Sequence, residues 1–328
     1  MNNRRKLLIT LGAGALAVPF AVFAQQQGKV WRIGFISSTS QRSGQGDVDA
    51  IVRGLRQLGY AEGRDFAFEH RWADGNMKLV AGFAAELVRM KVDLIVTRST
   101  IAALAVKSAT QSIPVVFTMV SDPVSTGIVN TLARPGGNLT GWTNMFSDTS
   151  VKLLELLRAM VPKASRVAVI SDPDNSGKAL EVTALQQAAR GQGLTLQSKG
   201  LRSAADIDNA FAQMSRERIE ALIVLADGVT STHGQRIIDH AAKQRLPAIY
   251  EIREFVDRGG LMSYGLNINH QYERTAEYIH RIFKGARPAD LPVEQPTRIE
   301  LVINSKTAKL LGLTIPQSLL ISADKLIE

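Results

Sequence analysis

The strongest constraint on the fold of this chain is a regular alternation of short apolar runs with longer amphipathic stretches. The apolar runs are continuous rather than alternating in polarity, which is typical of strands buried on both faces of a parallel sheet. In the first half, the expected strands are 31–37, 66–72, 93–97 and 115–120, and the helices expected to follow them are 47–58, 77–90, 100–110 and 124–132. This βαβα order predicts an α/β fold with helices on both faces of the sheet.

A second cycle of the same kind begins after a polar passage that contains glycine, residues 134–150. There the expected helices are 152–160, 178–192, 204–216 and 232–244, and the strands that follow them are 166–171, 194–199, 221–225 and 248–250. The sequence therefore predicts two Rossmann-like lobes with parallel sheets, joined by a hinge. Because open α/β sheets bind ligands outside the carboxyl ends of their strands, the loops there are the expected functional region.

The N-terminal segment has the pattern of an export signal. Arg4, Arg5 and Lys6 precede an uncharged apolar run, 7–23, which ends in small or short side chains before a polar stretch of glutamines. We expect residues 1–24 to be a signal peptide cleaved after about Ala24, by the Sec or the twin-arginine route, with a retained anchor as the alternative. The chain has no cysteine, which excludes disulfides and a lipid-modified N-terminal cysteine. The mature protein is thus expected to be periplasmic, without a stable membrane anchor.

The remaining composition argues against several classes of function. Loss of the signal lowers the net charge from +9 to +6, but the basic residues are scattered and no nucleic-acid-binding motif accompanies them, so no nucleic acid partner is expected. The five histidines show no metal-ligand spacing, and no P-loop or nucleophile elbow occurs. The glycines of the dinucleotide-like string at 12–17 lie inside the presumed signal. We therefore expect no metal, no cofactor and no catalytic residues.

Polar side chains follow the strands of the first lobe. Arg98, Ser99 and Thr100 come directly after one strand and open an alanine-rich helix, where free backbone N–H groups and hydroxyls can bind an anion. Ser121 and Asp122 follow the next strand. Helix capping explains Ser99, Thr100 and Asp122 equally well. Arg98 could pair with a ligand carboxylate or form a surface salt bridge.

The second lobe repeats this arrangement. The strand 166–170 ends in a polar loop, 171–177, and the strand 221–225 is followed by Asp227 in an otherwise apolar setting. A carboxylate buried in a cleft needs a cationic partner, and a ligand ammonium would serve. Donors on one lobe and Asp227 on the other could thus clamp an amino acid; the alternative is that Asp227 caps a helix.

Several segments together resemble one bacterial family, the ABC-transporter substrate-binding proteins that include tryptophan- and tyrosine-binding members. The resemblance covers nearly the whole mature chain. Its segments are RIGFIS (32–37), GLRQLGY (54–60), AAELV (84–88), DPV (122–124), ARPGGNLTG (133–141), REFV (253–256), GGLMSYG (259–265), GARPADLPVEQP (285–296), ELVIN (300–304) and LGLTIP (311–316).

The resemblance implies a type I periplasmic binding protein fold, with three hinge crossings and a ligand enclosed as the lobes close. Lobe 1 would comprise 30–145 plus about 265–290, and lobe 2 would comprise 146–264 plus about 291–328. The contacts that it implies for a small-molecule ligand, together with Arg98, are Ser38, Thr39, Ser40, Ser99, Thr100, Ser121, Asp122, Asn144, Asn175, Asp227, Tyr250, Tyr264 and Asn267.

The expected function is that of an extracytoplasmic receptor that delivers its ligand to an ABC permease in the inner membrane. Four aromatic residues near strand ends and crossings, Trp142, Phe146, Tyr250 and Tyr264, could sandwich a planar ligand or simply fill the core. An aromatic amino acid is favoured, with other amino acids and small organic anions open. The alternative is a ligand-sensing module for a sensor kinase or chemoreceptor, and a periplasmic enzyme is least favoured.

Overall fold

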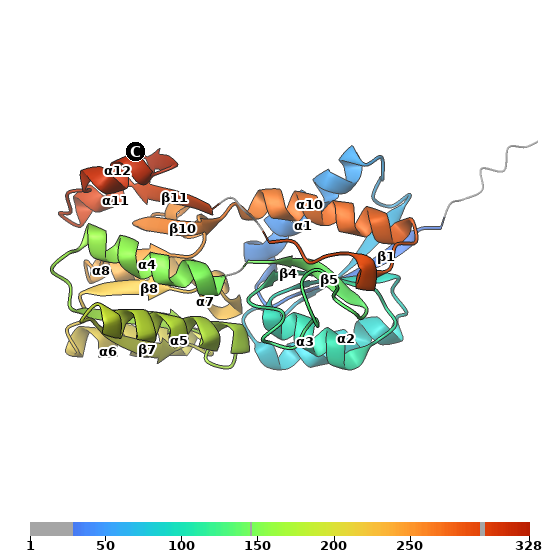
Figure 1. Ribbon diagram of the computed structural model, residues 1–328, viewed down its shortest axis with the longest axis horizontal. Helices are drawn as coiled ribbons and strands as arrows, with labels where there is room; N and C mark the ends of the chain where they lie inside the picture. Colours follow the sequence, from blue (N-terminus) through green and yellow to red (C-terminus); the bar gives the residue numbers. More distant parts are fainter. Residues whose placement is uncertain (1–28, 145, 296–298) are drawn as a thin grey trace, which may run out of the picture.

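The structure, a computed structural model, describes residues 29–144, 146–295 and 299–328 (Figure 1). The expected signal peptide, its cleavage site and the glycine string at 12–17 lie outside these residues. Over the described part, no helix is long and apolar enough to cross a membrane.

Lobe 1 is built on a five-stranded parallel sheet of order β2-β1-β3-β4-β5. Three helices follow strands of this sheet, and a fourth, α10, joins them from late in the chain and packs along α1 (Figure 1). The elements are β1 (Trp31–Ser37), α1 (Gln41–Gln57), β2 (Phe66–Trp72), α2 (Val80–Arg89), β3 (Leu94–Arg98), α3 (Thr100–Ala109), β4 (Val115–Val120), β5 (Leu139–Thr143) and α10 (Ile268–Phe283).

Lobe 2 is built on a seven-stranded sheet of order β12-β11-β10-β9-β8-β6-β7, in which only the β10–β11 pair is antiparallel among the described pairs. Its elements are α4 (Phe146–Met160), β6 (Arg166–Ser171), α5 (Ser176–Gly191), β7 (Thr195–Gly200), α6 (Ala204–Arg216), β8 (Ala221–Val224), α7 (Gly228–Thr232), α8 (Gly234–Lys243), β9 (Ala248–Tyr250), α9 (Glu254–Asp257), β10 (Met262–Leu266), β11 (Ile299–Asn304), α11 (Ser305–Leu310), α12 (Gln317–Ser322) and β12 (Lys325–Ile327). The predicted α/β class with two parallel-dominated sheets is confirmed.

The chain passes between the lobes three times. It leaves lobe 1 after Asn144, returns after Leu266 at the end of β10, and leaves again between Glu294 and Ile299. Glu294 still belongs to lobe 1, because its backbone N–H donates to Gly141 and its carbonyl accepts from Thr143. Three parallel connections of this kind allow the two lobes to move as rigid bodies about a hinge.

The sequence-based prediction was wrong around the end of lobe 1. No helix forms over 124–132, which instead runs through turns, and the passage 134–150 holds an unexpected strand, β5. The left-handed backbone at Asp122 and Gly127, with φ of 37° and 73°, interrupts helical geometry at this point. Other helices differ in extent: α1 begins at Gln41 rather than at 47, α4 begins at Phe146 rather than at 152, and 232–244 divides at His233 into the end of α7 and α8.

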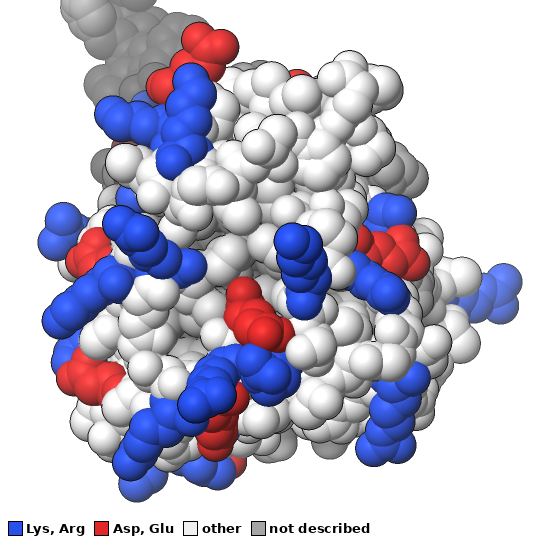
Figure 2. All heavy atoms as spheres, turned by 90° about the vertical axis from the view of Figure 1, so that its left-hand side faces the viewer, with Lys and Arg blue, Asp and Glu red and all other residues white. Residues whose placement is uncertain are grey.

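Burial explains why the strands read as continuous apolar runs. All residues of β3, β4 and β8 are buried, since helices cover both faces of each sheet, whereas the edge strand β7 is largely solvent-facing. Most charged side chains lie on the outside, and the few that are buried lie at or near the contact between the lobes. At the outer end of lobe 2, basic side chains are dispersed among acidic and uncharged ones rather than gathered in one stripe (Figure 2).

Candidate functional site

The carboxyl ends of the strands in the two lobes face each other, and the loops there are in direct contact. Among the described residues, hydrogen bonds join these facing loops: the Ser40 N–H donates to Thr232 Oγ1 at 3.0 Å, Ser43 Oγ donates to the Ser231 carbonyl at 3.3 Å, and Ser121 Oγ donates to Glu181 Oε1 at 2.7 Å. The structure therefore describes the two lobes closed against each other.

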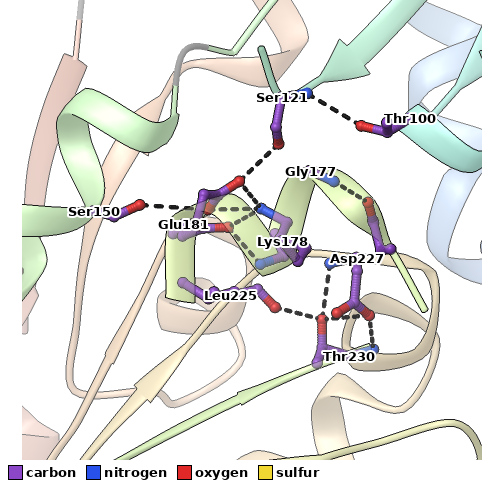
Figure 3. A network of polar contacts seen from close by, with 12 residues as sticks. Thr100, Ser121, Ser150, Gly177, Lys178, Glu181, Leu225, Asp227 and Thr230 are labelled. Atoms are coloured by element: carbon purple, nitrogen blue, oxygen red, sulfur yellow. Dashed lines mark hydrogen bonds and ion pairs between the residues drawn. The ribbon is translucent and has the colours of Figure 1, made fainter. Parts of the chain in front are cut away.

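Two glycines permit this close approach. A Cβ on Gly177, at the start of α5, would lie 2.8 Å from Ser121 Cβ and 2.9 Å from Thr100 Oγ1 of lobe 1 (Figure 3). A Cβ on Gly228, at the start of α7, would lie 2.7 Å from the Ser38 carbonyl oxygen. Both distances are shorter than an ordinary van der Waals contact, so a side chain at either position would hold the lobes apart.

A cavity of about 270 Å³ lies between the lobes. Lobe 1 contributes residues of α1 and the last residue of β3, and lobe 2 contributes residues of α7 and of the segment after β9. The volume is near the lower end of small-molecule pockets, which suits a compact ligand. The lining residues are Arg42, Ser43, Asp47, Arg98, Ser231, Ile252, Glu254, Asp257 and Arg258.

The floor of this cavity is a buried ion pair. Arg98 Nε lies 2.7 Å from Asp47 Oδ2, and both side chains are almost entirely enclosed. Tyr272 of α10 also contacts this pair by hydrogen bonds. Burial raises the pKa of Asp47 from 3.8 to about 6, although Arg98 and Tyr272 oppose the shift. The structure thus gives Arg98 a buried partner rather than the surface salt bridge considered from the sequence.

Four polar atoms in the lining are buried and have no hydrogen-bond partner among the described residues. Asp47 Oδ2 and Arg98 Nε face each other in the ion pair, whereas Ser231 Oγ and Glu254 Oε2, both on lobe 2, have no such partner. Burial raises the pKa of Glu254, and repulsion from Asp47 and Asp257 adds to the shift while Arg98 opposes it. Because burying an unpaired acceptor is costly, these atoms mark places where a ligand group could bind.

A second charged cluster joins the lobes beside Ser121 (Figure 3). Lys178 Nζ lies 2.9 Å from Glu181 Oε1 and 2.8 Å from Glu251 Oε2, and all three side chains are buried. Burial raises the pKa of Glu251 strongly, and its neighbour Glu181 raises it further. Glu251 Oε1 has no hydrogen-bond partner in the described structure. Glu181 also accepts the hydrogen bond from Ser121, so the cluster forms part of the contact between the lobes.

Sequence reasoning missed this cluster and most of the cavity lining. Lys178 and Glu181 stand three residues apart at the start of α5, and Glu251 directly follows Tyr250. A lysine and a glutamate at this spacing are ordinary on a solvated helix face. The one available signal was their position just after strand ends, where the loops of an α/β fold meet.

Asp227 does not have the arrangement expected of an ammonium clamp. Its Oδ1 accepts from the backbone N–H groups of Val229 and Thr230, and its Oδ2 accepts from the N–H of Asp172 at 2.6 Å. In turn, the Asp227 N–H donates a hydrogen bond to Thr230 Oγ1, so the two residues form a capping box at the start of α7. The carboxylate is engaged within its own lobe, so the geometry favours the helix-cap alternative.

Other expected site residues also serve as helix caps. Ser40, Ser99, Asn175 and Asn267 are the N-caps of α1, α3, α5 and α10, and Asp122 accepts from the Ser125 N–H at 3.0 Å. Ser40, Ser99 and Asn175 lie in loops that face the other lobe. Ser99 has φ 109°, a strained conformation for a residue with a side chain. Capping and ligand contact are compatible, since a cap orients free N–H groups at the helix start.

Four further residues are buried at or near the contact between the lobes. Ser38 Oγ and Asn144 Oδ1 have no hydrogen-bond partner among the described residues. Thr39 Oγ1 contacts Ser37 Oγ at 2.9 Å, and Thr100 Oγ1 accepts from the Ser121 N–H at 3.2 Å.

The expected aromatic sandwich is not assembled. The Tyr250 ring is buried and stacks on Phe255, with ring centroids 4.8 Å apart. Trp142 is buried against Tyr272 inside lobe 1, and Tyr264 packs with a hydrophobic cluster of lobe 2. The side chain of Phe146 lies outside the description. Core filling therefore accounts for the three aromatic rings that the structure describes, because large apolar rings gain most from full burial.

The match to a family model covers residues 32–327, and its description is ABC transporter substrate binding protein. The chain belongs to this family, and its fold is that of the type I periplasmic binding proteins.

Individual relatives carry more specific names. The chain is 27% identical over 263 residues, which are 80% of this chain and 75% of the relative, to the tyrosine-binding protein of Clostridioides difficile. An ABC domain in complex with L-Trp from Streptococcus pneumonia has 27% identity and a TM-score of 0.83, over 91% of this chain and 100% of that chain. The ligand-free, open structure of a substrate binding protein with adhesive properties from Clostridium difficile has 26% identity and a TM-score of 0.63, over 91% and 99%.

Proposed function

We propose that this protein is the extracytoplasmic, periplasmic receptor of an ABC importer and closes its two lobes over an amino acid. The single observation that carries the proposal is the cavity bounded by both lobes, whose lining holds unpartnered buried polar atoms. A ligand there contacts both lobes only when they are closed, so binding shifts the population toward the closed form. The closed form is then recognised by a permease in the inner membrane, and the receptor transforms nothing.

The arrangement of the lobes supports this reading. At nearly equal identity, the chain superposes better on the complex with L-Trp than on the ligand-free, open structure, with TM-scores of 0.83 and 0.63. The hydrogen bonds between the lobes agree with a closed state. We therefore take the described cavity to be the shape that a bound ligand would occupy.

The class of ligand has two sources of support. The relatives named for tyrosine and in complex with L-Trp favour an aromatic amino acid. The described lining is mostly charged, and Ile252 is its one aliphatic residue. Such a lining is suited to bind the charged amino and carboxylate groups of an amino acid. We assign Arg98 to the ligand carboxylate: its Nε faces Asp47, and a guanidinium has further N–H donors to offer.

A thermal-shift screen of the protein without residues 1–24, against the twenty amino acids and aromatic carboxylic acids, tests the proposal. A ligand at 100 times its dissociation constant should add about 2.7 kcal/mol to the free energy of unfolding. Arg98→Lys should weaken the binding of L-tyrosine and L-tryptophan, since lysine lacks the planar donor set of arginine. No stabilisation by any amino acid would overturn the proposal.

A further inference from the structure

The charges that line the cavity are arranged on opposite lobes. On lobe 1, Arg98 forms the floor together with Asp47, and on lobe 2, Glu254 stands at the start of α9. We propose that Glu254 binds the ammonium group of the ligand while Arg98 binds its carboxylate, so that the cavity selects a zwitterionic α-amino acid. This inference rests on the proposed function and names the two groups of the ligand that the site reads.

Glu254 differs from the other two carboxylates of the described lining in having a buried oxygen that is engaged neither in a hydrogen bond nor in an ion pair with a described residue. Asp47 is paired with Arg98, and the exposed Asp257 is paired with Arg253 at 3.2 Å. Glu254 Oε2 is buried and has no hydrogen-bond partner among the described residues. An ammonium group carries three donors, and one of them would satisfy this oxygen with a charge-assisted hydrogen bond.

The electrostatic setting of Glu254 also suits an incoming cation. Burial disfavours the charge of the carboxylate and Asp47 and Asp257 repel it, whereas Arg98 and Arg258 attract it. Despite these two cations, Glu254 Oε2 has no hydrogen-bond partner among the described residues. A ligand ammonium would supply a charged donor at the place where this oxygen has lost its water, which makes the contact stronger than it would be in solvent.

Asp47 acts on the other end of the ligand as a positioning residue. It is buried in α1 and holds the Arg98 guanidinium through the Nε side, at 2.7 Å. The remaining N–H groups of a guanidinium can then receive a carboxylate in the bidentate geometry that arginine favours. The described part of the lining holds three arginines and three carboxylates, so a ligand with one charge of each sign leaves these charges balanced.

The test compares three probes that share the phenol ring: L-tyrosine, tyramine, which lacks the carboxylate, and 3-(4-hydroxyphenyl)propionate, which lacks the ammonium. Their affinities for the wild-type protein are measured by isothermal titration calorimetry. We expect L-tyrosine to bind at least about tenfold more tightly than either analogue, because a hydrogen bond to a charged group is worth a factor of roughly ten to a hundred. An analogue without the ammonium that binds as tightly as L-tyrosine overturns the inference.

Glu254→Gln keeps the shape of the side chain and removes its charge. It should weaken L-tyrosine about tenfold or more and leave 3-(4-hydroxyphenyl)propionate unchanged or slightly improved, so that the preference for the amine disappears. Glu277→Gln, an exposed position on α10, is the matched control and should preserve the preference. Far-ultraviolet circular dichroism melts establish that each variant folds, and the comparison of probes on the wild-type chain needs no variant.

The main competing hypothesis is that Glu251, rather than Glu254, binds the ligand ammonium, and Glu251→Gln tests it. Glu251 also has a buried oxygen without a hydrogen-bond partner among the described residues, but it belongs to the Lys178 cluster. Loss of the preference in Glu251→Gln and its retention in Glu254→Gln would overturn the assignment to Glu254 while leaving the proposed function intact. If none of the three probes and no amino acid binds the wild-type chain, the proposed function itself fails, and the inference fails with it.

Discussion

Gly177→Ala should keep the lobes from closing without damaging either of them. A Cβ at this position would lie 2.8 Å from Ser121 Cβ. Carbon atoms in ordinary contact are about 3.5–4.0 Å apart, so the loops must separate by roughly 0.7 Å or more. The hydrogen bond from Ser121 to Glu181, now 2.7 Å long, would then exceed the usual upper limit of about 3.0 Å for a bond between two oxygens.

The size of the effect follows from the contacts between the lobes. A typical hydrogen bond contributes about 0.5–1.5 kcal/mol net, and the separation breaks the bond from Ser121 and lengthens those from Ser40 and Ser43. We expect the closed state to lose about 1–3 kcal/mol, which corresponds to an affinity about five- to 150-fold weaker. The unfolding temperature of the unliganded chain should hold or rise, because alanine is the better helix former by about 1 kcal/mol.

Small-angle X-ray scattering and calorimetry measure both consequences. The radius of gyration of Gly177→Ala should stay at its unliganded value at an L-tyrosine concentration that compacts the wild type. Gly82→Ala in α2 is the control, since a Cβ there meets no atom within 4 Å. Wild-type affinity in Gly177→Ala would refute the reasoning that these loops must touch for the ligand to bind, and a lowered unfolding temperature would show that the change acts inside lobe 2 instead.

Two further predictions concern buried carboxylates. Asp227→Ala should lower the free energy of unfolding of the unliganded protein by about 1–3 kcal/mol, because it leaves the Thr230 and Asp172 N–H groups unsatisfied. If the urea midpoint is unchanged and the binding of amines is lost, the hypothesis that Asp227 binds a ligand ammonium is restored. Asp47 has its pKa raised from 3.8 to about 6 by burial, so its stabilising effect is present below about pH 4 and is lost as the pH rises through 6. Between pH 4 and 7, urea titrations should show the wild type losing up to about 3 kcal/mol relative to Asp47→Asn; parallel pH profiles for the two proteins would contradict that shift.

The sequence predicted the regular elements well where a local pattern sufficed. The runs 31–37, 66–72 and 115–120 are strands with the expected bounds. The strands 31–37 and 115–120 are inside the sheet and mostly buried, which requires apolar side chains, whereas 66–72 is an edge strand that is only half-buried after Phe66. The segment 124–132 shows the limit of the same reasoning. Its apolar spacing resembles a helix, but the backbone at Asp122 and Gly127 turns the chain before a helix can start.

The candidate site was predictable as a region but not as a set of contacts. Strand ends pointed to Arg98, which lines the cavity, and to Ser121, which contacts the other lobe, since parallel strands end at a common edge. Asp227 stood in the same region and could not be told from a ligand contact, because a helix cap and a ligand-binding acid use the same residue at the same place. The backbone donors that engage Asp227 became known only with the position of α7 and of the loop after β6.

By itself, the sequence determined the alternation of strands and helices, the two α/β lobes and the loops that must meet between them, since these depend on hydrophobic periodicity and on signals within a few residues. The tertiary structure alone decided which charges come together. Arg98 pairs with Asp47 and shares a cavity with Glu254, and Lys178 joins Glu181 to Glu251. Except for Lys178 and Glu181, which are both in α5, these partners lie on different elements, and Arg98 and Glu254 lie on different lobes. Only the packing of the sheets and the closing of the lobes bring their side chains within reach.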